Sequence, residues 1–216
     1  MSVDLGGAVA IWHSLSAPRP ACLIIVRHGT TAWNLQLRIQ GRTDIPLNMH
    51  GERQAQQAAD AINQVTELNA VYTSPLQRAA ATATAIAQRC QVPLYERDDL
   101  IERAFGCLEG MTKAQREEWL ESHPHKVAVG QESWPNLKIR ACEVFAQLAA
   151  AHVGQIIAVV SHGALINAFL HTVSAGQFGT GMTNLANGSM CVAWHVEGNW
   201  NLAAINVREH LSQTSM

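Results

Sequence analysis

The feature that most constrains the fold is the apolar run Cys22-Leu23-Ile24-Ile25-Val26, in which no polar residue alternates with the apolar ones. A second run of the same kind covers residues 156–160. A strand with one face in water alternates apolar and polar side chains, so an unbroken run rich in β-branched residues indicates a strand covered on both faces. Such strands occur in parallel sheets with helices on either side. The two runs therefore predict an α/β protein.

A helix is expected over residues 51–65, because apolar side chains recur there with the spacing of one helix face. These side chains are Ala55, Ala58, Ala59, Ile62 and Val65. A short strand follows over 70–73. Ser74, Pro75 and Gln77 then have the order of a capping box with proline at the first helical position. They predict an alanine-rich helix that ends near residue 90.

In the second half of the chain, the apolar run 156–160 leads into a helical pattern over 164–170. Residues 191–196 and 201–207 flank Gly198-Asn199 and predict a tight hairpin. The segment from about residue 106 to 140 contains a short amphipathic helix over 113–121 and is expected to cross one end of the sheet.

These elements predict a three-layer α/β/α sandwich with a mostly parallel, mixed sheet in a single domain. The hairpin near the end of the chain supplies the antiparallel strands. We expect the domain to span residues 21–216 and a loose leader to cover residues 1–20.

The composition restricts the class of partner. The formal net charge is -2, which provides no global basic field for nucleic acid or an anionic membrane. The 5 cysteines are widely spaced and suit free thiols in a reducing cytoplasm better than a disulfide framework. No apolar run reaches the ~18–20 residues that span a membrane. The beginning of the chain has no basic region typical of a signal peptide.

Polar residues with matching chemistry follow three of the predicted strands. They form the groups Arg27-His28-Gly29, Ser74 to Arg78, and Ser161-His162-Gly163. Glu102 precedes the glycine turn at Gly106 and adds a carboxylate. Each group by itself is common in a surface loop or at a helix start. Because ligands of such folds bind beyond the carboxyl ends of the strands, their joint occurrence predicts a functional site.

In this order, the motifs resemble those of the histidine phosphatase superfamily, in its phosphoglycerate-mutase-like branch. The resemblance covers residues from about 23 to 211. The three groups above and Glu102 with Gly106 are part of this match. The other matching residues are Ile25-Val26, Thr30-Thr31, Trp33-Asn34, Arg38-Ile39-Gln40-Gly41, Asp44, Pro46-Leu47, Gly51, Gln54-Ala55, Thr73, Ala79, Leu108-Glu109-Gly110 and Asn187-Gly188-Ser189. A Gly-Gly-Glu-Ser sequence typical of the phosphatases appears here as Gly130-Gln131-Glu132-Ser133.

The resemblance implies a role for each matching residue. His28 is the nucleophile that becomes phosphorylated, and Glu102 is the proton donor to the leaving alcohol. A second set surrounds the phosphoryl group and the substrate; it comprises Arg27, Arg78, His162, Asn34, Gln40, Gly41 and Gly163. The implied reaction is hydrolysis of a small phosphomonoester without metal or other cofactor.

Elementary chemistry is consistent with these roles. A phosphomonoester dianion repels a nucleophile until cations neutralise it, and two guanidinium groups offer charge-assisted hydrogen bonds to its oxygens. A neutral imidazole is a good nucleophile when its other nitrogen is held as a donor. We expect a backbone carbonyl of a glycine turn to hold His28 in this way. We expect His162 to be protonated by proximity to phosphate.

Three alternatives remain at this stage. A bisphosphoglycerate-dependent phosphoglycerate mutase is the nearest, although Ala104-Phe105 follows Glu102-Arg103 where mutases typically have His-Tyr. A non-catalytic module that binds phosphorylated ligands is the second. A metal site built on His28 and His162 is the third, and it lacks clustered acidic or cysteine ligands. The sequence leaves the substrate unnamed and a homodimer through the terminal hairpin open.

Overall fold

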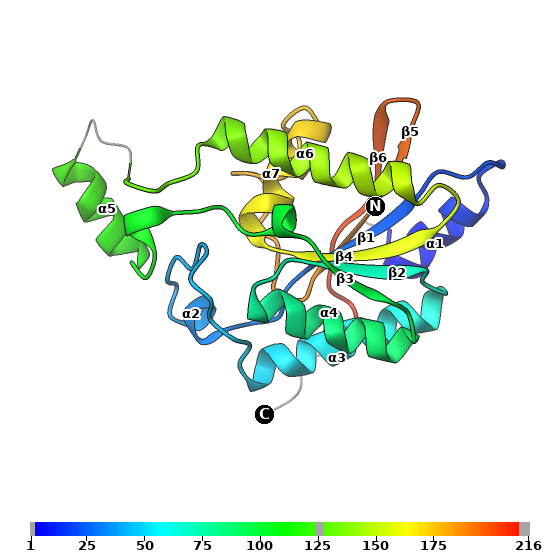
Figure 1. The fold of residues 1–216 in the computed structure, drawn as a ribbon, viewed down its shortest axis with the longest axis horizontal. Helices are drawn as coiled ribbons and strands as arrows, with labels where there is room; N and C mark the ends of the chain where they lie inside the picture. Colours follow the sequence, from blue (N-terminus) through cyan, green and yellow to red (C-terminus); the bar gives the residue numbers. More distant parts are fainter. Residues whose placement is uncertain (1–2, 124–127, 212–216) are drawn as a thin grey trace.

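The computed structural model describes residues 3–123 and 128–211, so the outermost ends of the predicted leader and domain lie outside the described residues. Within these ranges, six strands form one mixed sheet in the order β3-β2-β4-β1-β5-β6 (Figure 1). Strand β4 pairs in parallel with β1 and β2, and β2 pairs in parallel with β3. Strand β5 is antiparallel to both of its neighbours, β1 and β6. The strands are β1 (Cys22–Arg27), β2 (Ala70–Thr73), β3 (Leu94–Glu96), β4 (Ile156–Ser161), β5 (Met190–Val196) and β6 (Asn199–Val207).

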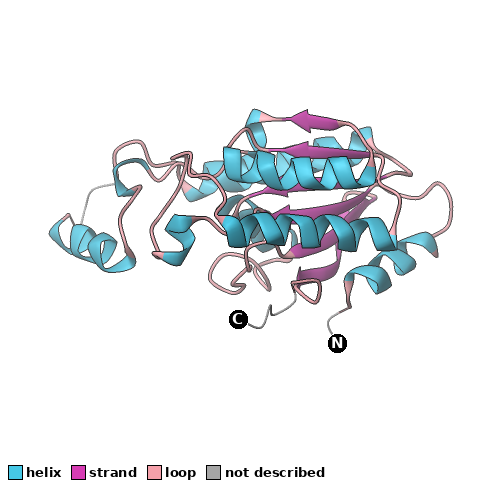
Figure 2. Cartoon of the chain, turned by 90° about the horizontal axis from the view of Figure 1, so that it is seen from below, coloured by secondary structure: helices cyan, strands magenta, loops and turns pink. Residues whose placement is uncertain are grey.

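Helices cover both faces of this sheet, which confirms the three-layer prediction. Helices α3 (Met49–Val65) and α4 (Gln77–Cys90) lie on one face, and α6 (Trp134–Ala151) and α7 (Gly163–Val173) lie on the other. Figure 2, seen from below, shows helices lying across the near face of the strands.

The unbroken apolar run of β1 is explained by these two layers. Ile24 and Val26 belong to the core beneath α3 and α4, while Leu23 and Ile25 belong to the core beneath α6 and α7. Alternate side chains of a strand point to opposite faces, so a strand between two cores has no position left for water.

The N-terminal segment differs from the expectation of a loose leader. Residues 5–13 form helix α1 (Leu5–His13), and Asp4 caps it by accepting a hydrogen bond from the backbone N–H of Gly7 at 2.7 Å. The buried side chains of Val9 and Trp12 join the same core as α3. The expectation of a loose leader is wrong for this helix, because its apolar face is covered by the rest of the molecule.

Other departures from the predictions are local. The hairpin turn is centred on Glu197 and Gly198, which have φ of 49° and 84°, and β6 already begins at Asn199. Strand β3 and the four-residue helix α2 (Ala32–Leu35) were not predicted. The segment between β3 and α6 carries α5 (Lys113–Ser122), which lies beyond the end of the sheet at the left of Figure 1. No helix in the described ranges is both long and apolar enough to cross a membrane.

Candidate active site

The ends of three neighbouring strands place the predicted residues together. Arg27 is the last residue of β1, and it pairs in register with Ser161, the last residue of β4. His28 and His162 follow directly. Strand β2 pairs with the other side of β4 and ends at Thr73, just before Ser74. Because the three strands are parallel, their polar exits meet at one edge of the sheet, as ligand sites of α/β folds do.

His28 is held in one orientation by its own chain neighbour. The imidazole is 2% exposed, and its Nδ1 lies 2.7 Å from the carbonyl oxygen of Gly29. A ring nitrogen that faces a carbonyl must carry the proton, so Nε2 keeps its lone pair. This confirms the expected carbonyl contact.

The pKa of His28 lies well below its ordinary value. Burial is the largest cause, and the charges of Arg27 and Arg78 add to it against a smaller opposing effect of the Gly29 hydrogen bond. His28 is therefore neutral at pH 7, as a nitrogen nucleophile must be.

His162 is completely buried, and its ring centroid lies 5.1 Å from that of His28. Its Nε2 is 2.8 Å from the hydroxyl oxygen of Ser74, which also accepts the backbone N–H of Leu76 at 3.3 Å. The Ser74 hydroxyl thus keeps its own hydrogen for a bond to Nε2. We assign this direction, with the proton of a neutral ring on Nδ1. Nδ1 is buried and has no partner among the described residues.

One expectation about this pair of residues needs correction, and one stays a prediction. Burial, followed by the charge of Arg78, places the pKa of His162 well below its ordinary value. The expected protonation of this ring depends on a neighbouring phosphate and stays a prediction. A neutral ring can still donate a hydrogen bond from Nδ1. The predicted capping box is absent, since α4 begins at Gln77 with Leu76 as its cap and without a side-chain cap. The hydroxyl of Ser74 contacts His162 instead.

Among the residues that the structure describes, the hydrogen-bond partners of the two guanidinium groups are carbonyl oxygens and not carboxylates. Arg78, 1% exposed, donates from Nη1 to Thr43 O at 2.9 Å and from Nη2 to Gly41 O at 2.7 Å. Arg27 donates from Nη1 to the carbonyl of Leu185. The Nε of each is buried without a hydrogen-bond partner in the described chain.

Burial is the main cause that lowers the pKa of both guanidinium groups. Buried cations with unpartnered N–H groups are costly unless an anion pairs with them. The chemistry of this pair therefore suits a phosphoryl group.

Glu102 lies in the loop between β3 and α5, and its carboxylate contacts the first turn of α7; the residue is 8% exposed. Its Oε1 accepts the backbone N–H groups of Arg103 at 2.8 Å and Leu165 at 3.1 Å, while Oε2 accepts that of Ala164 at 3.1 Å. Two of these donors are in the first turn of α7, where free N–H groups and the helix dipole favour an acceptor. A carboxylate oxygen has two lone pairs, so Oε2 keeps one for a proton.

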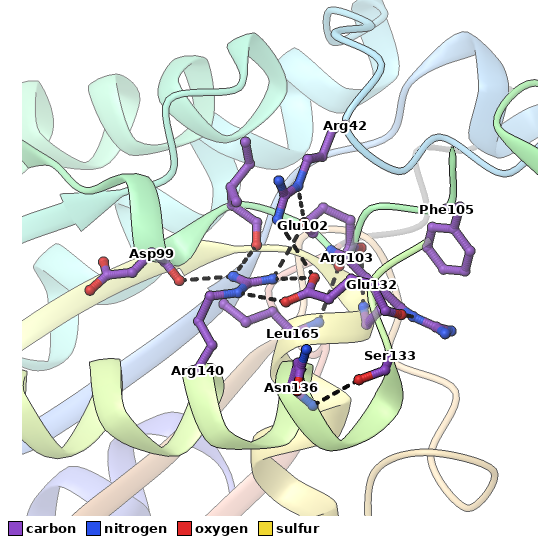
Figure 3. A network of polar contacts seen from close by, with 12 residues as sticks. Arg42, Asp99, Glu102, Arg103, Phe105, Glu132, Ser133, Asn136, Arg140 and Leu165 are labelled. Carbon is purple, nitrogen blue, oxygen red and sulfur yellow. Dashed lines mark hydrogen bonds and ion pairs between the residues drawn. The ribbon is translucent and has the colours of Figure 1, made fainter. Parts of the chain in front are cut away.

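A polar network holds the main chain around Glu102 (Figure 3). Arg140 donates to both carboxylate oxygens of Glu132, at 3.0 and 2.8 Å, and to the carbonyls of Asp99 and Ile101. Glu132 belongs to the 130–133 sequence in which this chain has Gln131 where the family pattern has glycine. The contact that this loop makes with Arg140 comes from Glu132, so the departure at residue 131 does not remove it.

A cavity of about 270 Å³ opens beside these groups. Eight of the nine predicted site residues line it, and His162 lies next to the ring of His28. The predicted lining residues are Arg27, His28, Asn34, Gln40, Gly41, Arg78, Glu102 and Gly163. Sequence reasoning did not assign Asn167, Asn184 or Leu185 to the site, because they come from α7 and the loop after it and carry no motif. In the described part of the chain, no group of three or more His, Cys, Asp or Glu is placed to hold a metal.

Comparisons with known proteins agree with this geometry. The sequence model of the histidine phosphatase superfamily (branch 1) matches residues 23–208. The uncharacterized phosphatase PhoE of Bacillus subtilis is 36% identical over 188 residues, which cover 87% of this chain and 95% of that protein. A metal-independent phosphoserine phosphatase of Arabidopsis thaliana is 32% identical over 204 residues, which cover 88% and 83% of the two chains.

A solved structure extends the agreement to the fold. A mutant phosphoserine phosphatase of Entamoeba histolytica in complex with phosphoserine superposes with a TM-score of 0.76. It is 27% identical, and the match covers 89% of this chain and 100% of the other. The chain therefore belongs to the histidine phosphatase superfamily and is a phosphatase of that superfamily.

Proposed function

We propose that this chain hydrolyses a small phosphorylated metabolite through a phosphohistidine formed on His28, without a metal. The observation that carries the proposal is a buried, neutral imidazole whose Nδ1 donates to Gly29 O. Beside it lie the buried Arg78 and the half-buried Arg27, each with a buried Nε that has no hydrogen-bond partner among the described residues. A bare nitrogen nucleophile in a cationic pocket is what attack on a phosphomonoester dianion requires.

In the first step, Nε2 of His28 attacks phosphorus and the bond from phosphorus to the alcohol oxygen breaks. N–H groups of Arg27 and Arg78 and the Nδ1–H of His162 bind the non-bridging oxygens, whose charge they stabilise during transfer. Glu102, in its acid form, gives the proton on Oε2 to the leaving oxygen. The alcohol then departs, and phosphohistidine remains.

In the second step, water attacks the phosphohistidine. The Glu102 carboxylate accepts a proton from that water, the bond from nitrogen to phosphorus breaks, and inorganic phosphate leaves with His28 restored. The N–H groups of Ala164 and Leu165 hold the carboxylate in the same place for both steps, since neither donor depends on substrate.

The substrate is proposed to be a compact phosphorylated alcohol. A cavity of about 270 Å³ suits a small metabolite better than a phosphoprotein segment. Two of the compared proteins are phosphoserine phosphatases, one of them with phosphoserine bound, so phosphoserine is the first compound to test.

The decisive experiment scores inorganic phosphate released from a panel of metabolite phosphates, with and without a chelator. We expect release from at least one small monoester, unaffected by the chelator. Loss of activity on chelation would support the metal alternative. Isomerised phosphoglycerate that forms only with a bisphosphoglycerate primer, in place of inorganic phosphate, would identify a mutase.

A second experiment tests the intermediate itself. Rapid acid-free quenching during turnover should trap an acid-labile phosphoenzyme that is absent from His28→Ala. A phosphate-binding protein that forms no phosphoenzyme with any monoester would support the binding-module alternative.

A further inference from the structure

The carboxylate of Glu109 is the acceptor for four donors, although no step of the proposed reaction uses it. Its Oε1 accepts the backbone N–H groups of Arg42 and Phe105, each at 3.0 Å. Its Oε2 accepts the N–H of Thr43 at 2.9 Å and the hydroxyl of the same residue at 2.6 Å. One half-buried side chain thus joins two segments that are about sixty residues apart in sequence.

The first of these segments is the one that holds Arg78. The carbonyls of Gly41 and Thr43 accept both terminal nitrogens of Arg78, while Glu109 holds the N–H groups of Arg42 and Thr43 in the same three-residue loop. The loop lies directly against the carboxylate: a Cβ at Gly41 would be 2.1 Å from Oε1 of Glu109. The directions of the Gly41 and Thr43 carbonyl groups therefore depend on the position of the Glu109 carboxylate.

The second segment follows the proposed proton donor. Phe105 is the third residue after Glu102, and Arg42 donates from Nε to the carbonyl of Glu102 at 3.2 Å. Glu109 consequently fixes the distance between the loop that holds Arg78 and the main chain that carries Glu102.

We propose that Glu109 is a positioning residue: it holds residues 41–43 so that the remaining N–H groups of Arg78 face the phosphoryl group. The role rests on the proposed function in one respect, since it takes Arg78 as a phosphate ligand. Glu109 itself does not touch the substrate in this arrangement.

The ionisation of Glu109 agrees with this arrangement. Burial favours the acid form, but the hydrogen bonds from the Thr43 hydroxyl and from three backbone N–H groups outweigh it, and the pKa is lowered. Four donors require the two acceptor oxygens of an ionised carboxylate. Glutamine has the same shape but only one acceptor oxygen, so its NH₂ group would face two donors. Glu109→Gln therefore removes the acceptor without opening a cavity.

The test measures affinity for inorganic phosphate by calorimetry, which needs no turnover. One misdirected charge-assisted contact costs about tenfold to a hundredfold in affinity. We expect Glu109→Gln to weaken phosphate binding by about tenfold or more and to lower kcat/KM for p-nitrophenyl phosphate similarly. Glu143→Gln, the same change at an exposed position of α6, should leave both at the wild-type values.

A double-mutant comparison separates positioning from general stability. If Glu109 acts through Arg78, Glu109→Gln should change phosphate affinity by less than about twofold in an Arg78→Ala background. An undiminished effect there, or wild-type affinity in Glu109→Gln with only a lower melting temperature, would refute the role.

Thr43→Val decides the question if Glu109→Gln does not fold. It removes one of the four donors at similar volume and should weaken phosphate binding in the same direction by a smaller factor, whereas unchanged affinity would count against the role. A wild-type protein that binds phosphate but hydrolyses no monoester would end the proposed function and leave the Glu109 measurement valid. A wild type that does not bind phosphate would end both.

Discussion

We assign the same tautomer to His28 and His162, and in the proposed mechanism one hydrogen bond to each ring gives the two histidines different roles. The proton on Nδ1 of His28 is taken by Gly29 O, which leaves a bare Nε2. In His162, the Nε2 faces Ser74 Oγ, which leaves an Nδ1–H. The proposed nucleophile and the proposed donor thus lie side by side as two neutral rings, since the charges of two nearby guanidinium groups disfavour a protonated one.

Ser74→Ala tests this assignment. Without the hydroxyl donor, the proton of His162 can move to Nε2, and a bare Nδ1 would face the phosphoryl oxygens. We expect kcat/KM for p-nitrophenyl phosphate to fall by about tenfold, since a single buried donor to developing charge has at least that effect. Ser14→Ala is the control: it removes an exposed hydroxyl at the end of α1 and should leave kcat/KM unchanged. Equal activities of the two variants would contradict the assignment.

Glu102→Gln tests the proton donor. An alkoxide is a strong base and leaves poorly without a proton, whereas p-nitrophenolate leaves readily. General acid catalysis contributes about 10²–10⁴-fold, so we expect a loss of that order on an alkyl phosphate and a much smaller one on p-nitrophenyl phosphate. Steady-state rates on both compounds provide the measurement. Equal losses on the two substrates would remove Glu102 from this role.

At the scale of elements, the site depends on how closely the turn after β1 approaches α3. A Cβ added at Gly29 would lie 2.4 Å from the carbonyl oxygen of Gly51, in the first turn of α3. The same turn carries the Gly29 carbonyl that orients His28. Glycine at position 29 therefore allows the turn after β1 to contact the start of α3. We expect this contact to position the ring of His28, the proposed nucleophile.

Gly29→Ala is expected to push this turn away from α3 and to misplace the Gly29 carbonyl. We predict a loss of kcat/KM of about a hundredfold, comparable to removal of a catalytic donor, together with a lower melting temperature. Gly6→Ala is a matched control, because the nearest atom to its Cβ is 3.7 Å away and alanine favours the helix that it lies in. Activity of Gly29→Ala near the wild-type level would show that the approach is not required.

At the scale of the whole molecule, the central strands were the most predictable part of the fold. Strands β1 and β4 lie between two cores, so burial marks them in the sequence directly. The polar residues that follow these strands also predicted most of the candidate site, because neighbouring parallel strands end at the same edge of the sheet. Helix α1 and strand β3 have no comparable pattern in the sequence. Helix α1 is stabilised by packing on the core, and β3 consists of three exposed residues that pair with β2.

The contacts that orient the site were the least predictable part. The bond between Ser74 and His162 joins residues 88 positions apart, and the Glu109 contacts depend on the path of two loops. Local patterns do not encode such distances. In the case of Ser74, the local pattern indicated a different partner, the start of α4, and tertiary structure overrode it.

The two buried histidines make the stability of the whole molecule depend on pH. Their folded pKa values lie well below 6.5, the value that a free side chain has. The unfolded chain therefore binds more protons below about pH 6.5, and stability falls as the pH decreases from there towards the folded pKa values. Each histidine contributes a slope of at most about 1.4 kcal/mol per pH unit.

We expect His28→Asn to melt with a shallower pH dependence than the wild type between about pH 6.5 and 5. Melting temperatures measured at intervals across this range provide the test. Because acid also protonates carboxylates in both proteins, the difference between the two slopes is the quantity to compare. Parallel slopes would mean that His28 is not held neutral in the folded state.

The guanidinium groups of Arg27 and Arg78, each with a buried and unpartnered Nε in the described chain, also affect how the protein behaves in different buffers. Any tetrahedral oxyanion that occupies their free N–H groups binds the folded chain and not the unfolded one, and at a hundred times its dissociation constant such a ligand adds about 2.7 kcal/mol of stability. Thermal scans should show a higher midpoint in phosphate or sulfate than in chloride at equal ionic strength, and Arg78→Ala should reduce this gain. Melting temperatures of variants of this protein are therefore comparable only when the buffer anion is the same.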